Sequence, residues 1–139
     1  MIKTDIAIIG LGITSKLTAL ALASINCKVM IFGQLNPITN TSNLVTFFSQ
    51  NSINFLNEIG IEGLVNQSMP IKEISCSKLE QYQLEKKFQI NFGEKYSKDD
   101  MGRVIINSSL NESLDNQIKK NKNISIISNK LITHYRHQG

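Results

Sequence analysis

The 139-residue sequence contains no tryptophan, two cysteines and two arginines, and each shortage narrows the possible functions. Cys27 and Cys76 lie far apart, without the C-x-x-C spacing of a zinc site or a dithiol redox centre. This spacing favours neither a metal site nor a redox pair. We therefore expect both cysteines to be small buried apolar residues in a reducing compartment.

No window of the sequence is apolar over the length of a membrane-spanning helix without polar interruption. Lys3 and the apolar stretch after it resemble the start of a secretory signal, but Asp5 and two glycines interrupt that pattern. The residues before Cys27 do not form a convincing cleavage site either. We therefore expect a cytoplasmic protein.

Basic residues give the sequence a net charge of +4, but most of the lysines are scattered. The one dense group, Lys119, Lys120 and Lys122, falls at the predicted end of a helix, where cations are favourable to the helix dipole. No aromatic residues interleave with this group. A solvated helix end is favoured over a nucleic-acid surface, so we expect no nucleic-acid partner.

The sequence offers no catalytic or metal-binding arrangement. His134 and His137 lie in the polar final segment, 133–139, with no carboxylate or thiol nearby, so a frayed end is favoured over a metal site. None of the many serines stands in the G-x-S-x-G turn of a hydrolase nucleophile. We name no catalytic residue and no metal ligand.

The strongest positive signal is the order of segments in the first 33 residues. An apolar run, Ile6 to Ile9, meets the glycine turn Gly10-Leu11-Gly12, an alanine- and leucine-rich helical pattern follows, and a second apolar run covers 29–32. This order predicts a strand, a tight turn, a helix and a parallel strand. The helix N-terminus of such a unit offers backbone N–H groups to a diphosphate.

The glycine turn supplies the candidate cofactor-binding residues. Gly10 permits the sharp turn, Gly12 lets a phosphate approach the backbone, and Ser15 stands at the third glycine position of G-x-G-x-x-G. With the amides that open the helix, the candidates are Gly10, Gly12, Ile13, Thr14 and Ser15. The alternative is a glycine turn in an α/β domain that binds nothing.

One polar contact of a dinucleotide site is missing. An acidic residue is expected at the end of the second strand, where it would bind the ribose hydroxyls. The sequence has Gly33 and Gln34 there, with no carboxylate nearby. The unit has the layout of a dinucleotide site without its acidic ribose partner.

The middle of the chain predicts a polar loop over 34–48 and then a short helix. Ser49 is the expected cap and Gly60 the expected stop of this helix, and a further helical turn covers 61–65. We expect its apolar residues to share one face: Ile53, Phe55, Leu56 and Ile59. Strand-like alternation at 71–76 and 88–92 predicts half-exposed strands of a second layer, joined by a long polar connection.

The last third predicts a strand, a helix and a final core strand. After Val104-Ile105-Ile106, Ser109 and Glu112 have the spacing of a capping box. Leu110, Leu114 and Ile118 continue one helical face. The run 124–127 reads as the third core strand.

Four stretches, in matching order and spacing, resemble the N-terminal part of the FAD-dependent aromatic hydroxylases. They are the opening unit (5–22), the helix region 52–61, the strand 70–74 and the segment Met101 to Leu114. Within that family, the sequence is similar to the enzymes that hydroxylate the polyprenyl-phenol ring in ubiquinone biosynthesis. The resemblance covers nearly the whole chain.

The resemblance implies an α/β fold with a partial Rossmann-like, FAD/NAD(P)-binding parallel sheet and a short antiparallel excursion from a second layer. Residues 1–139 would form an incomplete FAD-binding domain. In it, 1–70 and 101–133 make the Rossmann-like core, and the strands of 71–100 belong to the second layer. The implied cofactor is FAD, and the implied reaction is two-electron flavin chemistry that adds a hydroxyl to an electron-rich ring.

Three features depart from the family pattern. Gly33 replaces a ribose-binding glutamate, Ser15 replaces the last glycine, and the segment 43–49 lacks the arginine that the family carries near the flavin. Two further family motifs, an Asp-Gly pair and a later Gly-Asp pair, have no counterpart here, nor does the substrate domain. We therefore expect that this chain alone holds FAD weakly and hydroxylates nothing.

Three functional hypotheses stay open. The chain is part of a hydroxylase whose remainder lies on a complementary polypeptide, or a decayed or truncated gene product, or a stand-alone nucleotide-binding or interaction module. The loss of several cofactor contacts favours the second, and no residue argues for the third. An incomplete sheet exposes strand edges, so we also expect a homo-oligomer through those edges. By family analogy the protein would be peripheral to the inner membrane.

Overall fold

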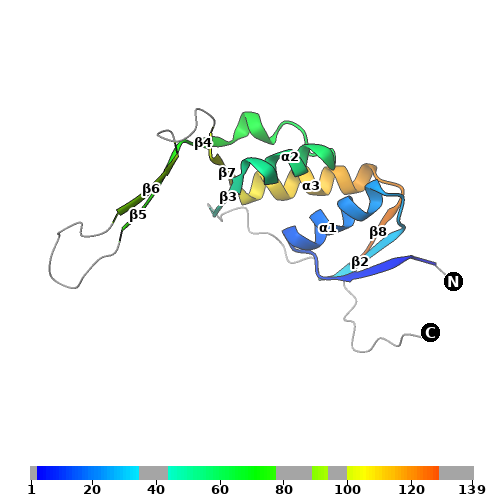
Figure 1. Ribbon diagram of the computed structural model, residues 1–139. Helices are drawn as coiled ribbons and strands as arrows, with labels where there is room; N and C mark the ends of the chain where they lie inside the picture. The colour runs from blue at the N-terminus through cyan, green and yellow to red at the C-terminus, as the bar shows by residue number, and fades with distance from the viewer. Residues whose placement is uncertain (1–2, 35–43, 78–88, 94–99, 129–139) are drawn as a thin grey trace.

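The computed structural model describes residues 3–34, 44–77, 89–93 and 100–128 (Figure 1). The opening unit consists of β1 (Ile6–Ile9), α1 (Ile13–Ser24) and β2 (Val29–Gly33). β8 (Ile124–Ser128) joins it, and the three strands form a parallel sheet in the order β1-β2-β8. The chain is therefore α/β with a partial Rossmann-like parallel sheet, as the sequence predicts.

The core lies where α1 and α3 (Asn107–Lys120) pack together beside the parallel sheet. Paired residues of a parallel sheet share a face, so Ile8, Ile31 and Ile126 point to one side of it. The helical face predicted from Leu110, Leu114 and Ile118 is buried. Apolar burial from two helices and the sheet holds this half together.

A second, antiparallel sheet has the order β3-β7-β4, with β3 (Val45–Ser49), β7 (Gly102–Ile106) and β4 (Met69–Ile71). The prediction of a polar loop over 34–48 is wrong from residue 45 onward, because β7 supplies a partner for the alternating apolar residues of β3. The segment 104–106 is a strand, and it pairs with β3 and β4. The division of the chain into core and second-layer segments stays a prediction.

α2 (Gln50–Glu58) follows β3 directly and packs against β3 and β7. The predicted cap is confirmed, since the Ser49 side chain accepts a hydrogen bond from the Ser52 amide. Gly60 follows the helix with a φ of +82°. Phe55 is 40% exposed and does not share the buried face of Ile53 and Leu56, which is a correction to the predicted stripe.

The predicted turn at 61–65 appears slightly later, as the 3-10 helix η1 (Leu64–Gln67). The predicted capping box at Ser109 and Glu112 is wrong: α3 begins at Asn107, directly after β7, so Ser109 lies inside the helix. Lys119 and Lys120 occupy the last helical turn, as predicted.

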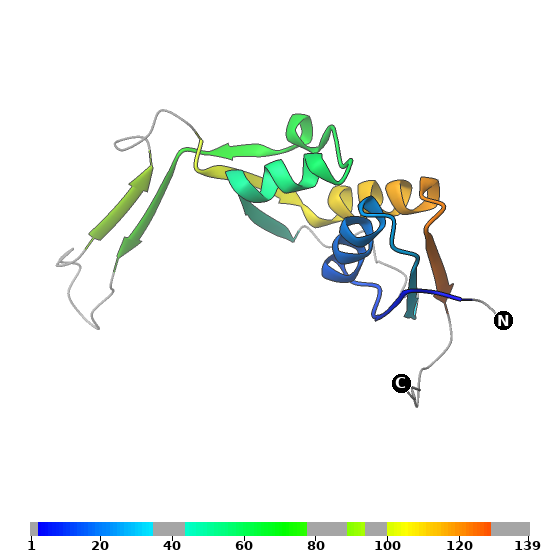
Figure 2. The ribbon, with the colours of Figure 1, turned by 45° about the vertical axis from the view of Figure 1, so that its right-hand side comes forward.

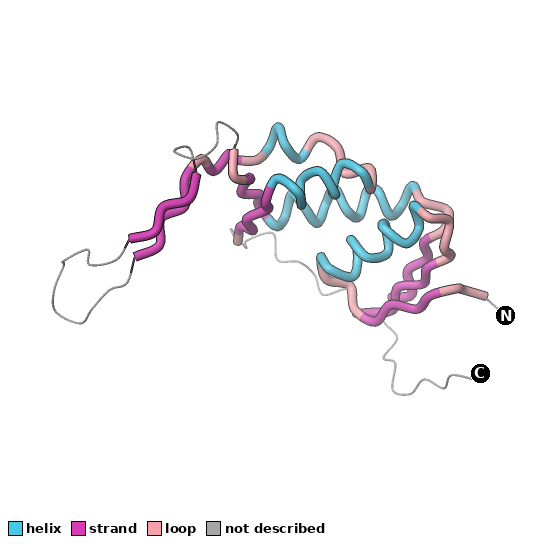
Figure 3. Tube along the Cα trace, in the orientation of Figure 1, coloured by secondary structure: helices cyan, strands magenta, loops and turns pink. Residues whose placement is uncertain are grey.

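The strands predicted at 71–76 and 88–92 are confirmed over 73–76 and 89–92 as a two-stranded antiparallel ribbon, whereas Ile71 belongs to β4 and residue 88 lies outside the described residues. It consists of β5 (Glu73–Ser77) and β6 (Gln89–Gly93), and their predicted connection lies outside the described residues. Figures 1 and 3 show this ribbon projecting away from the helices and from both other sheets. It remains apart from them in the turned view of Figure 2.

The cysteines differ from the prediction of burial. Cys27 is half-buried and packs against the core, whereas Cys76 is exposed on β5. Cys76 is exposed because the ribbon that carries it is covered by no other described element. Among the described residues, no helix has the length and apolarity required to cross a membrane.

Candidate functional site

The bend between β1 and α1 is the candidate site. Gly10 has a φ of +119°, a conformation that residues with a side chain rarely adopt, so the sharp turn depends on this glycine. Its amide still donates to the Phe32 carbonyl (2.7 Å), which ties the turn to β2. Gly12 then begins α1 as its N-cap, and the first helical hydrogen bond runs from the Lys16 amide to the Gly12 carbonyl.

The first amides of α1 are free to bind a ligand. Gly12 offers no side-chain cap, and no acceptor among the described residues meets the backbone N–H groups of Ile13, Thr14 and Ser15. Such groups, aligned with the positive end of the helix dipole, are suited to an anion. The first turn also contains no acidic residue that would repel one.

The side chains in the first turn of α1 differ in how far they are buried. The Ile13 side chain packs against the core, so only its backbone is available to a ligand. Thr14 is exposed, while Ser15 is half-buried beside Gly10. A Cβ atom at Gly10 would lie 3.1 Å from the Ser15 hydroxyl oxygen, so the two small residues pack closely. All five predicted residues therefore lie in the bend before α1 or in its first turn.

The structure distinguishes the two ends of the expected dinucleotide site. A Cβ atom at Gly12 would meet nothing within 4 Å, so the space on that side of the N-cap residue is open. A Cβ atom at Gly33 would lie 2.9 Å from the Leu11 side chain, which fills the space at the end of β2. The residues thus fit a diphosphate but provide no acidic partner for a ribose.

One buried charge was missed by the sequence analysis. Lys16 is 4% exposed, although it lies in the first turns of α1. Its ammonium group is 2.7 Å from an Asp115 carboxylate oxygen and donates to the Asn111 side-chain oxygen at 3.1 Å. Its position three residues after Ile13 and four before Leu20 places it in the apolar stripe of α1, which was the available signal.

A polar hollow of about 560 Å³ runs along α3 beside this ion pair. Its lining contains hydroxyl, amide, carboxylate and ammonium groups, and it includes both partners of Lys16. The lining residues are Ser108, Ser109, Asn111, Glu112, Asp115, Asn116 and Lys119. This chemistry suits hydrogen bonding to a polar molecule and provides no nucleophile with an adjacent base.

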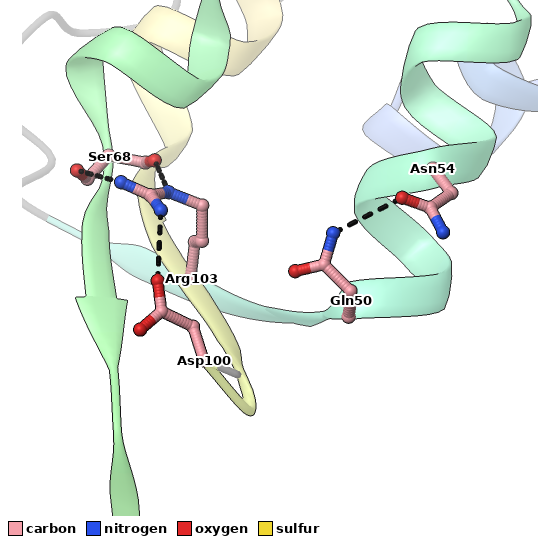
Figure 4. Close-up of polar contacts among 5 residues, drawn as sticks. All are labelled: Gln50, Asn54, Ser68, Asp100 and Arg103. Atoms are coloured by element: carbon pink, nitrogen blue, oxygen red, sulfur yellow. Dashed lines mark hydrogen bonds and ion pairs between the residues drawn. The ribbon is translucent and has the colours of Figure 1, made fainter. Parts of the chain in front are cut away.

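A further polar cluster joins β7 to the segment before β4 (Figure 4). The Arg103 guanidinium donates to the hydroxyl and carbonyl oxygens of Ser68, and it lies 3.3 Å from an Asp100 carboxylate oxygen. Each of the three guanidinium nitrogens donates to a protein acceptor, so this cluster fastens the second sheet. The Gln50–Asn54 hydrogen bond in the same view lies within α2.

Metal chemistry has no support in the part of the chain that the structure describes. No group of three or more histidine, cysteine or acidic side chains there could hold an ion. His134 and His137 lie outside the described residues.

No family model and no curated protein matches the sequence. Solved structures do match. The p-nitrophenol 4-monooxygenase PnpA from Pseudomonas putida DLL-E4 is 13% identical, with a TM-score of 0.66 over 92% of this chain and 32% of that one. PqsL, a probable FAD-dependent monooxygenase from Pseudomonas aeruginosa, is 16% identical, with a TM-score of 0.61 over 90% of this chain and 32% of that one.

A third similar structure is 2-methyl-3-hydroxypyridine-5-carboxylic acid oxygenase, at 16% identity and a TM-score of 0.57, covering 89% of this chain and 32% of that chain. The chain spans about a third of the length of these proteins. At these identities the likeness establishes the fold. Two of these three neighbours are named as monooxygenases, one of them as a probable FAD-dependent one, and the third is named as an oxygenase.

Proposed function

We propose that this chain is the FAD-binding portion of a flavin-dependent monooxygenase that hydroxylates an aromatic ring, in the branch of ubiquinone biosynthesis. The single observation that supports the flavin assignment is that the N-terminus of α1 has no side-chain cap and has free space beside Gly12. The fold shared with FAD-dependent and aromatic-ring monooxygenases supports it. The ubiquinone branch rests on the resemblance of the sequence stretches.

In this proposal the diphosphate of FAD binds to the backbone amides of Ile13, Thr14 and Ser15. Gly10 forms the turn and Gly12 leaves room for the phosphate oxygens. When bound in a complete enzyme, the flavin supplies the oxygen transfer to the ring. The Lys16–Asp115 ion pair connects the first turns of α1, next to these amides, to α3.

The same proposal includes weak binding by this chain alone. Gly33 and the Leu11 side chain occupy the place of the acidic ribose partner. The lost charge-assisted hydrogen bond is worth about 1.5 to 3 kcal/mol, or roughly ten- to a hundredfold in affinity. We expect a dissociation constant for FAD between about 10 µM and 1 mM.

The alternative of a decayed, non-catalytic remnant is favoured by this same missing contact. Both readings predict no turnover by the chain alone. They differ in what the bend still does, because a remnant without selection on its site has no reason to retain an open Gly12. Affinity at the bend therefore decides between them.

The test is a titration of the purified chain with FAD, followed by quenching of flavin fluorescence, with Gly12→Ala as the variant. Gly12 has a φ of −74° and open space at its Cβ, so alanine fits the protein and intrudes only on a phosphate. We expect at least about tenfold weaker binding, about 1.4 kcal/mol, by a chain that stays folded at the temperature of the titration, because alanine in place of a glycine N-cap costs no more than about 1 kcal/mol of stability. Thr18→Ala, at an exposed position one turn further along α1, should bind like the wild type.

Two results would contradict the proposal in different ways. If the wild type shows no binding at 1 mM FAD, or if Gly12→Ala binds equally well, the diphosphate site is wrong. If the purified chain already carries stoichiometric flavin, or hydroxylates a polyprenyl phenol when given a reductant, the assignment of weak binding and inactivity is wrong.

A further inference from the structure

One edge of the parallel sheet brings together lysines from three separate segments of the chain. The register pairs Ile6 with Val29 and Val29 with Ile124, so the starting ends of β1, β2 and β8 lie side by side. α1 leads to the start of β2 and α3 to the start of β8, so both helices also end at this edge, on the right-hand side of Figure 1. We call the five exposed lysines there the basic edge: Lys3, Lys28, Lys119, Lys120 and Lys122.

Hydrogen bonds hold the three segments of this edge together. The Thr4 hydroxyl and the Asp5 amide both donate to the Lys28 carbonyl oxygen, at 2.8 and 2.9 Å, which places the start of the chain beside Lys28. On the other side, the Val29 amide donates to the Asn123 carbonyl oxygen at 2.8 Å. The lysines of the basic edge are therefore neighbours in the fold, although they are far apart in the sequence.

The basic edge is nearly free of opposite charge. Its segments, 3–5, 24–28 and 119–123, contain one acidic residue, Asp5, whose carboxylate accepts a hydrogen bond from the Lys28 amide. Within the described residues, no lysine of the basic edge is paired with a carboxylate. Five lysines and one aspartate give these short segments a net charge equal to the +4 of the whole chain.

The helix dipole accounts for only part of this charge. Lys119 and Lys120 lie in the last turn of α3, where cations are favourable to the dipole. Lys3 and Lys28 precede strands and belong to no helix. They reach the edge through the pairing of β1 with β2, so the fold assembles a positive surface that the helix end does not require.

An exposed apolar residue lies at the same edge. Ile25 follows the last residue of α1 and is 69% exposed. Asn26 has a φ of +64°, and its amide donates to the Ala23 carbonyl oxygen, so the chain turns tightly here before Lys28. An apolar side chain on a positively charged surface is suited to the boundary between the headgroups and the acyl chains of a bilayer.

We infer that the basic edge, together with Ile25, is a docking surface for a lipid bilayer with anionic headgroups. Each lysine near such a surface raises the affinity about fivefold. Nucleic-acid surfaces instead use arginine on base edges and aromatic side chains that stack on bases, and the segments of this edge contain neither. The flavin bend lies at the other end of the 12-residue α1, about 18 Å away, so this docking does not rest on flavin binding.

The first test is co-sedimentation of the full chain with vesicles. Vesicles of phosphatidylglycerol and phosphatidylcholine in equal parts are compared with vesicles of phosphatidylcholine alone. We expect the anionic vesicles to bind at least about a hundredfold more tightly at low salt, because several lysines act together. Binding should weaken as salt is added, since salt screens exposed charges. Equal binding to both kinds of vesicle, or none to either, overturns the inference.

Two charge reversals of equal size locate the contact. Lys28→Glu changes the basic edge, and Lys72→Glu changes an exposed lysine between β4 and β5. The hydrogen bonds of Lys28 to Thr4 and Asp5 use its backbone, so its side chain is free to change. We expect Lys28→Glu to weaken binding to anionic vesicles at least about tenfold and Lys72→Glu at most about threefold. Equal losses in the two variants would show that the edge is not the contact.

Ile25→Trp separates a bilayer from other anionic partners and leaves every charge in place. The sequence contains no tryptophan, so this substitution gives a single fluorescent probe at the edge. We expect its emission to shift to shorter wavelength on anionic vesicles, and binding to tighten at least about threefold, because tryptophan is favourable at the membrane interface. An unshifted emission with bound vesicles, or tighter binding to a DNA duplex than to anionic vesicles, would exclude a bilayer as the partner of this edge.

Discussion

The body of the molecule, which comprises the parallel sheet, the β3-β7-β4 sheet and the three α-helices, differs sharply from the β5–β6 ribbon. The body closes on a shared core, whose largest fully buried side chains come from β2, α2, β7 and α3: Ile31, Leu56, Ile105, Leu110, Leu114 and Val29. The ribbon has a regular strand register but contributes no residue to that core. The ribbon therefore shows that two strands of this chain can pair regularly without contributing to a packed core.

The difference shows which stabilisation each region can have. Buried apolar area is the main favourable term in folding, and only the body has it within one chain. The ribbon has hydrogen bonds between its strands, whose net contribution is small because water competes for them. We expect the ribbon to exchange its amide hydrogens faster than β2 and β7.

The largest expected effect is a loss of stability on Leu114→Ala, a substitution in the core of the body. Leu114 is fully buried in the core cluster, so the substitution removes apolar contacts and leaves a cavity. We expect the free energy of unfolding in urea to fall by about 4 kcal/mol, a large part of the 5 to 15 kcal/mol of a typical domain.

The matched substitution in the ribbon sharpens the comparison. Phe92→Ala removes a larger side chain, but from a position that is 47% exposed. At concentrations where the chain is a monomer, we expect a loss of less than about 1 kcal/mol. A cost equal to that of Leu114→Ala would mean that the ribbon is packed as firmly as the body.

The next largest effect tests the second sheet, which links the two regions through β4. A Cβ atom at Gly102 would collide with the Phe48 carbonyl oxygen, and it would also lie 2.8 Å from two atoms of the Phe47 ring. Gly102→Ala must therefore separate β7 from β3, at a cost of about 3 kcal/mol in the same urea experiment. Gly12→Ala is the control glycine, since its Cβ meets nothing, and it should cost no more than about 1 kcal/mol, because alanine is a poorer N-cap than glycine.

Periodicity in the sequence predicted the elements that have a clear apolar pattern of their own. The parallel unit around α1, the buried face of α3 and the strand at β8 all follow from local patterns of apolar residues. The glycine turn was predicted with its five residues, because Gly10 and Gly12 are the residues that such a bend requires. The ligand that binds there stays a proposal.

Features that depend on distant partners were not predictable in this way. β3 was included in a predicted polar loop, although Val45, Phe47 and Phe48 are residues typical of strands, and its partner β7 lies more than fifty residues later. Lys16 looks like a surface lysine until α3 brings Asn111 and Asp115 to it. Cys76 has the sequence surroundings of a buried residue, and only the isolation of the ribbon leaves it exposed. For Lys16 and Cys76, the missing information is which distant residues lie beside them in the folded chain.

The charged pair inside the body gives a smaller expected effect than Leu114→Ala or Gly102→Ala, and it tests whether the body tolerates polar groups only when they are paired. Asp115→Ala leaves the Lys16 ammonium, 4% exposed, with Asn111 as its remaining described partner. Loss of one member of a buried pair costs about 3 to 5 kcal/mol, but the Asp115 side chain is 38% exposed, so water can partly replace it. We expect a loss of about 2 kcal/mol.

Lys16→Met, which removes the charge and keeps the length of the side chain, should be within about 1 kcal/mol of the wild type. If Lys16→Met were as damaging as Asp115→Ala, the ion pair itself would hold α1 against α3; if neither variant changed the urea midpoint, the helices would be joined by apolar packing alone.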